Sequence, residues 1–272
     1  MKDLDFLVEE LKKESAGYQN VETPNDEEGK RYFLRSLMNV RAPKQLKDEV
    51  LKVQDEYLQN RAIEKGIVKL EDIPTIKETL NSANTFADKL SVWQGDITRL
   101  GCDAIVNAAN SQMLGCFVPN HQCIDNAIHT FAGIELRCEC NRQMNLLREK
   151  NGNYYEQPTS IPMLTDAFNL PSKHVIHVVG PIVYGSLTTS LENDLINCYK
   201  NVLDMCKDNN IRSVAFCCIS TGEFHFPNEK AAKIAVDTVT EWLDENYEYV
   251  DRIIFNVFKD LDKGIYEELL SR

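Results

Sequence analysis

The stretch that decides the fold is LSVWQGDITRLGCDAIVNAAN, residues 90–110. It contains two short apolar runs, Leu90 to Trp93 and Ala104 to Asn107, each followed by a polar segment. Outward along the chain, similar runs alternate with stretches in which apolar residues recur at helical spacing. The further strand-like runs are 175–179, 214–219 and 253–258, and the helical stretches are 124–132, 135–148, 191–209 and 229–245. Strands separated by helices predict crossover connections and a largely parallel or mixed sheet with helices on both faces.

The loops that follow the strands are candidate binding segments, because ligands of such sheets bind beyond the carboxyl ends of the strands. Asp96, in the loop 94–98, can accept a hydrogen bond from an exocyclic amine such as that of adenine. A turn aspartate bonded to its own backbone fits this position equally. Asn110, in the loop 107–111, follows small residues that would let a sugar hydroxyl approach, and an ordinary polar loop fits as well.

A third loop, 219–227, connects a predicted strand to a helix whose expected N-cap is Asn228. Main-chain N–H groups in such a loop, with the N-terminus of a helix behind them, suit a pyrophosphate. The loop holds one glycine, Gly222, so it carries only part of a phosphate-loop pattern. His225 lies in the same loop and is a further candidate to touch a ligand there.

Ten residues, Cys116 to Asp125, hold two thiols, one imidazole and one carboxylate. His121 and Cys123 point the same way if the backbone between them is extended, and the turn residues Pro119-Asn120 can return Cys116 toward them. Zinc prefers thiolate and imidazole ligands; structural sites have four of them, whereas catalytic sites keep one position open. Three ligands therefore predict a zinc site of the catalytic type. A buried cysteine pair beside a satisfied histidine is the alternative.

Composition and the first part of the chain narrow the class of protein. Residues 1–87 have amphipathic helical spacing and no metal-binding or phosphate-binding pattern, so we expect a helical extension with a structural role. The formal charge of −12 argues against general binding to nucleic acid. The charged first residues argue against a signal peptide. The sequence contains no apolar run of about 18 residues, so we expect no membrane span. Nine cysteines, an odd number, do not resemble a disulfide framework, so we expect a cytoplasmic protein.

Several of these motifs resemble those of macrodomains in their order and spacing. They are Val92 to Thr98, Asp103 to Ser111, Asp125 to His129 with Ala132-Gly133, Val178 to Pro181, and Ile219 to Pro227. Where common macrodomains carry a glycine-rich run, this chain has Cys116, His121 and Cys123. That departure resembles the zinc-dependent macrodomains, a microbial subclass of protein-ADP-ribose hydrolases with a helical N-terminal extension similar to Arg35 to Arg41. The resemblance implies a three-layer α/β/α sandwich with a mixed sheet over residues 88–272, preceded by the extension 1–87; the segment 154–165 departs from the family's usual turn.

The same resemblance implies roles for individual residues. Asp96 is expected to hold the adenine amine, and the main chain of Ile97 an adenine nitrogen. Main-chain groups around the pyrophosphate would come from Ser220, Thr221, Gly222, Glu223 and Phe224. Asn110, Ile124 and Asp125 would add further contacts to ADP-ribose, with Asn110 and Asp125 catalytic. Phe258 is a candidate to stack on adenine, and a core position fits it too.

The implied activity is zinc-dependent removal of mono-ADP-ribose from protein side chains. Zinc, held by Cys116, His121 and Cys123, is expected either to activate a water or to coordinate ribose oxygens, with Asp125 as general base. Two other functions would use the same binding residues: a non-catalytic ADP-ribose reader with structural zinc, and an O-acetyl-ADP-ribose deacetylase. The expected partners are ADP-ribose and a mono-ADP-ribosylated protein, without nucleic acid or membrane, and a monomer is favoured.

Overall fold

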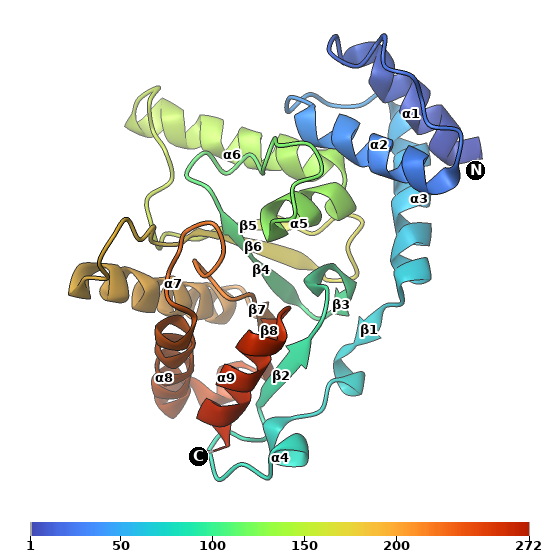
Figure 1. Cartoon of the computed structure of the whole chain (residues 1–272). Coiled ribbons are helices and arrows are strands. Elements are labelled where there is room, and N and C mark those ends of the chain that lie inside the picture. Colours follow the sequence, from blue (N-terminus) through green and yellow to red (C-terminus); the bar gives the residue numbers. More distant parts are fainter. Residues whose placement is uncertain (1, 272) are drawn as a thin grey trace. The chain divides into compact units, whose positions relative to one another are not determined.

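The computed structural model describes residues 2–271, which divide into two compact units built from non-contiguous stretches of chain (Figure 1). The helical unit comprises the chain up to Gly66 together with Gln112–Glu156 and Ala167–Leu170. The sheet unit comprises Ile67–Ser111, Gln157–Asp166 and the chain from Pro171 onward. Because these units interleave along the sequence, the expected domains 1–87 and 88–272 stay a prediction.

The helical unit is built on amphipathic helices whose apolar residues recur every three or four positions. Its helices are α1 (Lys2–Glu14), α2 (Glu27–Val40), α3 (Asp48–Lys65), α5 (Ile124–Ala132) and α6 (Ile134–Asn151). α2 begins where the side chain of Asp26 accepts a hydrogen bond from the N–H of Gly29, and two glutamates in its first turn match the helix dipole.

The first three helices bury a common apolar cluster. Leu7 and Val8 of α1 and Leu37 of α2 are almost fully buried in it, and each contributes about 1.5–3 kcal/mol relative to an exposed side chain. Ile134 and Cys138 of α6 belong to the same cluster. The N-terminal helices therefore share their core with a segment that follows them by about 70 residues of sequence.

The sheet unit holds the strands that the alternating pattern predicts, together with short ones that it does not. They are β1 (Val68–Lys69), β2 (Leu90–Gln94), β3 (Leu100–Gly101), β4 (Ala104–Ala109), β5 (Met163–Asp166), β6 (His174–Val179), β7 (Ser213–Phe216) and β8 (Arg252–Val257). The main sheet has the order β2-β8-β7-β4-β6-β5, and β1 pairs with β3 separately. β5 runs antiparallel to β6 and all other neighbours in the main sheet are parallel, so the sheet is mixed, as predicted.

The sheet unit also contains helices, and those between β6, β7 and β8 return the chain from one parallel strand to the next. The helices of this unit are α4 (Ile76–Thr79), α7 (Thr189–Asp208), α8 (Asn228–Asn246) and α9 (Asp260–Leu270), with short 3-10 turns at Leu70–Asp72, Ile97–Arg99 and Tyr247–Tyr249. Tyr199 of α7 packs on Phe216 of β7, and Tyr266 of α9 packs on Phe255 of β8, each with ring centroids 5.0 Å apart. These aromatic pairs fix both helices on the sheet.

Two boundaries on either side of the loop 219–227 differ from the sequence-based expectation. The run 214–219 is not one strand: β7 ends at Phe216, and Cys217-Cys218 begin the following loop. Asn228 is not the N-cap of α8, because the N-cap is Pro227. Instead, the Asn228 amide donates to Asp262 at 2.6 Å and links α8 to α9. In contrast, α5 begins and ends at the predicted residues.

No helix within residues 2–271 is long and apolar enough to span a membrane.

Candidate functional site

A tight turn in the helical unit brings the cysteine and histidine side chains together. The N–H of His121 donates to the carbonyl of Val118 at 3.2 Å, with Pro119 and Asn120 between them. Asn120 has φ 54°, in the left-handed region that asparagine tolerates better than most residues. Proline followed by a left-handed residue is the pattern of a type II turn, so the predicted role of Pro119-Asn120 is confirmed.

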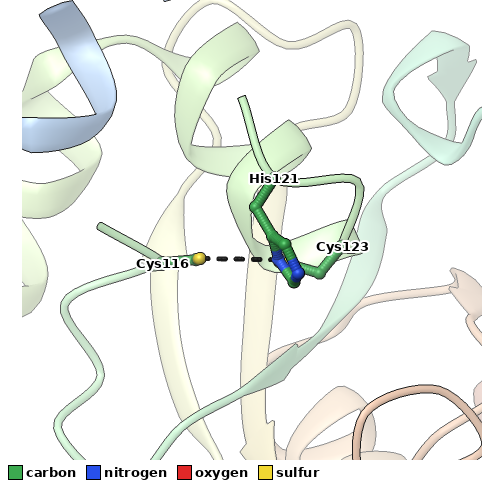
Figure 2. A group of neighbouring side chains, drawn as sticks. All are labelled: Cys116, His121 and Cys123. Carbon is green, nitrogen blue, oxygen red and sulfur yellow. Dashed lines mark hydrogen bonds between the residues drawn. The ribbon is translucent and has the colours of Figure 1, made fainter. Parts of the chain in front are cut away.

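Cys116, His121 and Cys123 converge as their spacing predicts (Figure 2). Their ligand atoms all lie within 4.8 Å of one another, and the Cys116 Sγ is 3.7 Å from the His121 Nδ1. Tetrahedral zinc with ordinary bond lengths would set sulfur and nitrogen about 3.6 Å apart. The donor types and the spacing therefore fit zinc, and no fourth protein ligand joins the group within the described chain, residues 2–271. All three side chains are half-buried, so solvent reaches the group.

The electrostatics of the group favour a cation. Burial raises the pKa of the Cys123 thiol to about 12, and the neighbouring Cys116 and Asp125 add to the rise. The N–H of Asn126 opposes it by donating to the Cys123 Sγ at 3.4 Å, because Cys123 is the N-cap of α5. Two adjacent thiolates without a cation would repel each other, whereas a bound divalent ion would stabilise both.

Asp125 lies in the first turn of α5 and is only 5 % exposed. Its Oδ1 is 3.6 Å from the Nε2 of His129, one helical turn later. The His129 ring leaves no space for a side chain at position 115, because a Cβ added at Gly115 would lie 2.7 Å from it. Gly115 also has φ 79°, so glycine is required there for two independent reasons. His129 is a buried residue of α5.

Three side chains to which the sequence analysis assigned no role in the site hold the loop from within the helical unit. The Asn126 amide donates to the carbonyl of Val118 at 3.0 Å, and the guanidinium of Arg35 donates to the carbonyl of His121 at 3.0 Å. Asn39 accepts from the N–H of Asn120 at 2.9 Å. The helices expected to be purely structural therefore contact the loop directly through Arg35 and Asn39.

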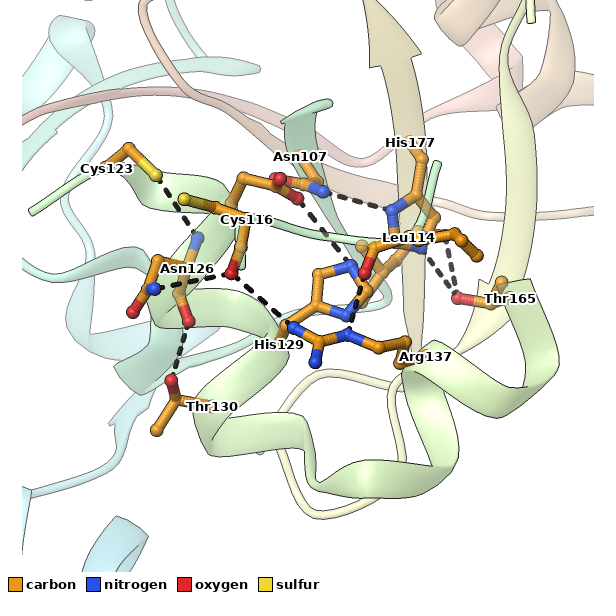
Figure 3. A network of polar contacts seen from close by, with 12 residues as sticks. Asn107, Leu114, Cys116, Cys123, Asn126, His129, Thr130, Arg137, Thr165 and His177 are labelled. Atoms are coloured by element: carbon orange, nitrogen blue, oxygen red, sulfur yellow. Dashed lines mark hydrogen bonds and ion pairs between the residues drawn. The ribbon is translucent and has the colours of Figure 1, made fainter. Parts of the chain in front are cut away.

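Arg137 of α6 is a further anchor, 5 % exposed and bound almost entirely to main-chain carbonyls. It donates to the carbonyl of Leu114 at 2.7 Å, just before the predicted metal ligands (Figure 3). It also donates to the carbonyl of Arg41 at 2.6 Å, just after α2. Its Cζ also lies 4.2 Å from the centroid of the Phe117 ring. One buried cation thus ties the end of α2 to the loop that bears Cys116.

The sheet unit presents the other predicted residues at one edge. Because β2, β4, β7 and β8 are parallel, the loops after them leave the sheet at their common carboxyl ends. Asp96 follows β2 and Asn110 follows β4, three strands apart in the sheet order. At about 4.8 Å per strand the two positions are separated by about 14 Å, so an elongated ligand is needed to reach both.

Asp96 has the turn role that was one of its two interpretations. Its Oδ1 accepts from the Thr98 N–H at 3.0 Å and from the Thr98 hydroxyl at 2.7 Å, which caps the 3-10 turn Ile97–Arg99. Ile97 is buried. Contact of Asp96 and Ile97 with adenine stays a prediction.

The loop from Ser220 to Phe224 begins with a residue in the left-handed region. Ser220 has φ 66° and is 5 % exposed, and its hydroxyl oxygen is buried without a hydrogen-bond partner among residues 2–271. A buried hydroxyl of this kind is costly unless a ligand or water satisfies it. The Thr221 N–H donates to the Cys218 carbonyl at 3.3 Å, and its contact with a pyrophosphate stays a prediction. Gly222 and Glu223 are exposed, and Phe224 is half-buried.

Several other candidates are placed by the structure. His177 is fully buried; its Nδ1 lies 3.0 Å from the Asn107 amide and its Nε2 3.1 Å from the Thr165 hydroxyl, so it is a satisfied core histidine (Figure 3). Phe258 is 75 % exposed, so the core interpretation of that residue is wrong.

The chain has clear relatives. The family model for the Macro domain matches residues 106–235. A protein-ADP-ribose hydrolase of Treponema medium is 46 % identical over 266 residues, covering 98 % of this chain and 97 % of the relative. A protein-ADP-ribose hydrolase of Staphylococcus aureus strain Mu50 is 38 % identical over 270 residues, covering 99 % and 95 %. A mutant Oceanobacillus iheyensis macrodomain, solved with ADPR, superimposes with a TM-score of 0.59 at 37 % identity, over 66 % of this chain and 91 % of the other.

Both relatives are matched over nearly their whole length, which includes the N-terminal helices as well as the sheet. The fold class predicted from the motifs, an α/β/α sandwich with a mixed sheet and a helical N-terminal region, is confirmed. The chain therefore belongs to the macrodomain family, among its protein-ADP-ribose hydrolases.

Proposed function

We propose that this chain hydrolyses the bond between mono-ADP-ribose and a protein side chain, and that the reaction depends on zinc held by Cys116, His121 and Cys123. The observation that carries the proposal is the convergence of two thiols and one imidazole within 4.8 Å in a member of a hydrolase family. The relatives' name supplies the substrate class, and the solved macrodomain with ADPR supports the ligand.

The nucleotide end of the ligand is proposed to bind the strand-end loops of the sheet unit. The carboxylate of Asp96 would accept a hydrogen bond from the adenine amine. Ser220 would donate its buried hydroxyl to the pyrophosphate, which would satisfy an otherwise unpaired group. The about 14 Å between the ends of β2 and β4 suits a ligand that extends from Asp96 to Asn110.

Asp125 is the proposed general base. The main chain of Ile124, the residue before it, would contact the ligand. The Asp125 carboxylate would accept a proton from water while the water oxygen bonds to the anomeric carbon of the distal ribose. The bond from that carbon to the protein side chain breaks, and the leaving atom takes a proton from solvent, to which Asp125 returns the one it accepted. Asn110 would orient the ribose. When bound, zinc would supply positive charge that polarises the bond to be broken or lowers the pKa of water.

The decisive experiment incubates purified chain with proteins mono-ADP-ribosylated through defined linkages. One arm contains the zinc-loaded protein, a second the protein stripped by chelator, and a third the stripped protein with zinc restored. Released ADP-ribose is quantified by chromatography. Release in the first and third arms alone supports the proposal.

Other outcomes assign other functions. ADP-ribose binding without any release would make the chain a reader with structural zinc. Release of acetate from O-acetyl-ADP-ribose, without release from protein, would make it a deacetylase. Equal release with and without metal would leave hydrolysis in place and remove zinc from it.

A further inference from the structure

Asn126, the third residue of α5, contacts the loop that bears the predicted metal ligands at several points (Figure 3). Its side-chain amide donates to the carbonyl of Val118 at 3.0 Å and lies 3.5 Å from that of Cys116. Its own N–H donates to the Cys123 sulfur at 3.4 Å. The residue is fully buried, so its amide is a fixed part of the structure.

The orientation of that amide is set by Arg35 of α2. The Arg35 Nε and Nη2 both donate to the Asn126 Oδ1, at 3.0 and 2.7 Å. The same Nη2 donates to the carbonyl of His121 at 3.0 Å. Because the guanidinium occupies the oxygen of the amide, the nitrogen of the amide must face the loop carbonyls.

We propose that Arg35, acting through Asn126, is a positioning residue for the metal ligands. It would fix the loop in the conformation in which Cys116, His121 and Cys123 share one ion. The inference rests on the proposed zinc site, and it assigns the N-terminal helices a functional role.

The physical reason lies in the loop itself. Residues 115–123 form no helix or strand. Two of them, Gly115 and Asn120, have a positive φ. Such a segment has a high conformational entropy when unbound, so ligand atoms stay aligned only if their carbonyls are held. Arg35 holds the His121 end directly and the Val118 end through Asn126. Contacts behind metal ligands commonly change metal affinity by about 10–100-fold.

The test measures zinc affinity, by competition with a chromophoric chelator, and the rate of zinc release. Arg35→Gln removes the positive charge and most of the N–H donors of the guanidinium. Arg35→Lys keeps the charge but lacks the planar set of N–H donors. Both variants are expected to bind zinc about 10–100-fold more weakly and to release it correspondingly faster. With cobalt(II) in place of zinc, their visible absorption bands should shift, because the ligand geometry changes.

Arg31→Gln is the matched control. Arg31 lies one turn earlier on α2 and lines the same cavity, of about 560 Å³, as Arg35, but it pairs with Glu27 and Glu64 rather than with the loop. Its zinc affinity and cobalt spectrum should equal those of the unmodified chain. Unfolding midpoints of the metal-free proteins report whether a variant has lost general stability instead.

The outcomes separate this inference from the zinc site itself. If the unmodified chain binds zinc and Arg35→Gln and Arg35→Lys bind it equally well, the positioning role is overturned while the metal site stands. A loss of affinity in Arg31→Gln as large as in the Arg35 variants would overturn it as well. If the unmodified chain binds no zinc, both the proposed zinc dependence and this inference fall together.

Discussion

Gly180 and Ser220 approach each other so closely that a methyl group at position 180 would lie 2.1 Å from the Ser220 hydroxyl oxygen. The two residues follow β6 and β7 in the sheet unit, and Ser220 opens the loop proposed to bind the pyrophosphate. Gly180 thus allows Ser220 to keep its buried position. Its role in the motif Val178 to Pro181 is steric, since the φ of Gly180 lies outside the left-handed region.

Gly180→Ala should therefore weaken ADP-ribose binding. Overpacking of this kind costs about 1–3 kcal/mol. If the 220–224 loop shifts to relieve it, the free energy of ADP-ribose binding should become less favourable by a similar amount. Isothermal titration calorimetry measures the effect. Gly264→Ala is the control, because an added Cβ meets nothing within 4 Å there and the position is helical. That control should bind normally and gain about 0.5–1 kcal/mol of stability.

Asp96→Ala should also weaken ADP-ribose binding, by about 1–3 kcal/mol, because a hydrogen bond to a charged group is lost. The change also removes the cap of the following turn, so Thr98→Val provides the comparison: it removes the hydroxyl donor at 2.7 Å and keeps the carboxylate. Calorimetry should show a much larger loss for Asp96→Ala. Equal losses in the two variants would assign Asp96 to the turn alone.

Cys116→Ala should abolish stoichiometric zinc binding, because two remaining ligands hold zinc poorly. Elemental analysis after dialysis gives the zinc content per chain. Cys138→Ala is the control: Cys138 lies in the same helical unit but belongs to its apolar cluster and not to the predicted zinc ligands, so this variant should retain zinc. Full zinc in Cys116→Ala would show that the ligand set is wrong.

Asp125→Asn should retain zinc but lose rate, by about 10²–10⁴-fold, if Asp125 is the general base. Single-turnover release of ADP-ribose from modified protein measures this. Glu223 is the other carboxylate in a candidate loop and is exposed, so Glu223→Gln should retain most of the activity. A reversed ranking would transfer the base role to Glu223.

His177 should make the fold less stable in mild acid. Burial lowers its pKa from 6.5 to about 3, so the folded chain keeps it neutral while the unfolded chain protonates it below pH 6.5. Above pH 6.5 His177 is neutral in both states and does not lower the free energy of unfolding. As pH falls from 6.5 toward 3, protonation of the unfolded chain lowers the free energy of unfolding by about 1.4 kcal/mol per pH unit. Denaturant unfolding at pH 7.0 and 5.0 should show a smaller pH dependence in His177→Gln. An unchanged dependence would contradict this assignment.

The sequence predicted well what depends on local patterns. The limits of α5 follow from Cys123 at its N-cap and Gly133 at its end, and the turn at Pro119-Asn120 follows from turn chemistry. Both signals lie within a few residues of the feature they determine. β5 was missed because four residues, paired on one side only, leave no periodic pattern.

The supports of the loop could not be predicted, because they join residues far apart in sequence. Arg35 reaches Asn126 across 91 positions, and Arg137 reaches Arg41 across 96. An arginine in an amphipathic helix ordinarily indicates a solvated face. Only the packing of α2 and α5 in the helical unit reveals that Arg35 points to a buried amide.

The interleaved path of the chain has a consequence for its synthesis on the ribosome. The apolar cluster of α1 to α3 is completed by Ile134 and Cys138, 68 and 72 positions after Gly66. At typical bacterial or eukaryotic elongation rates, roughly 4 to 15 seconds pass between the emergence of the two parts. For that interval the nascent helices have an uncovered apolar face, and Arg35 has no Asn126 to bind. Chaperones and proteases therefore meet this segment before the loop with the two cysteines and the histidine can take its final form.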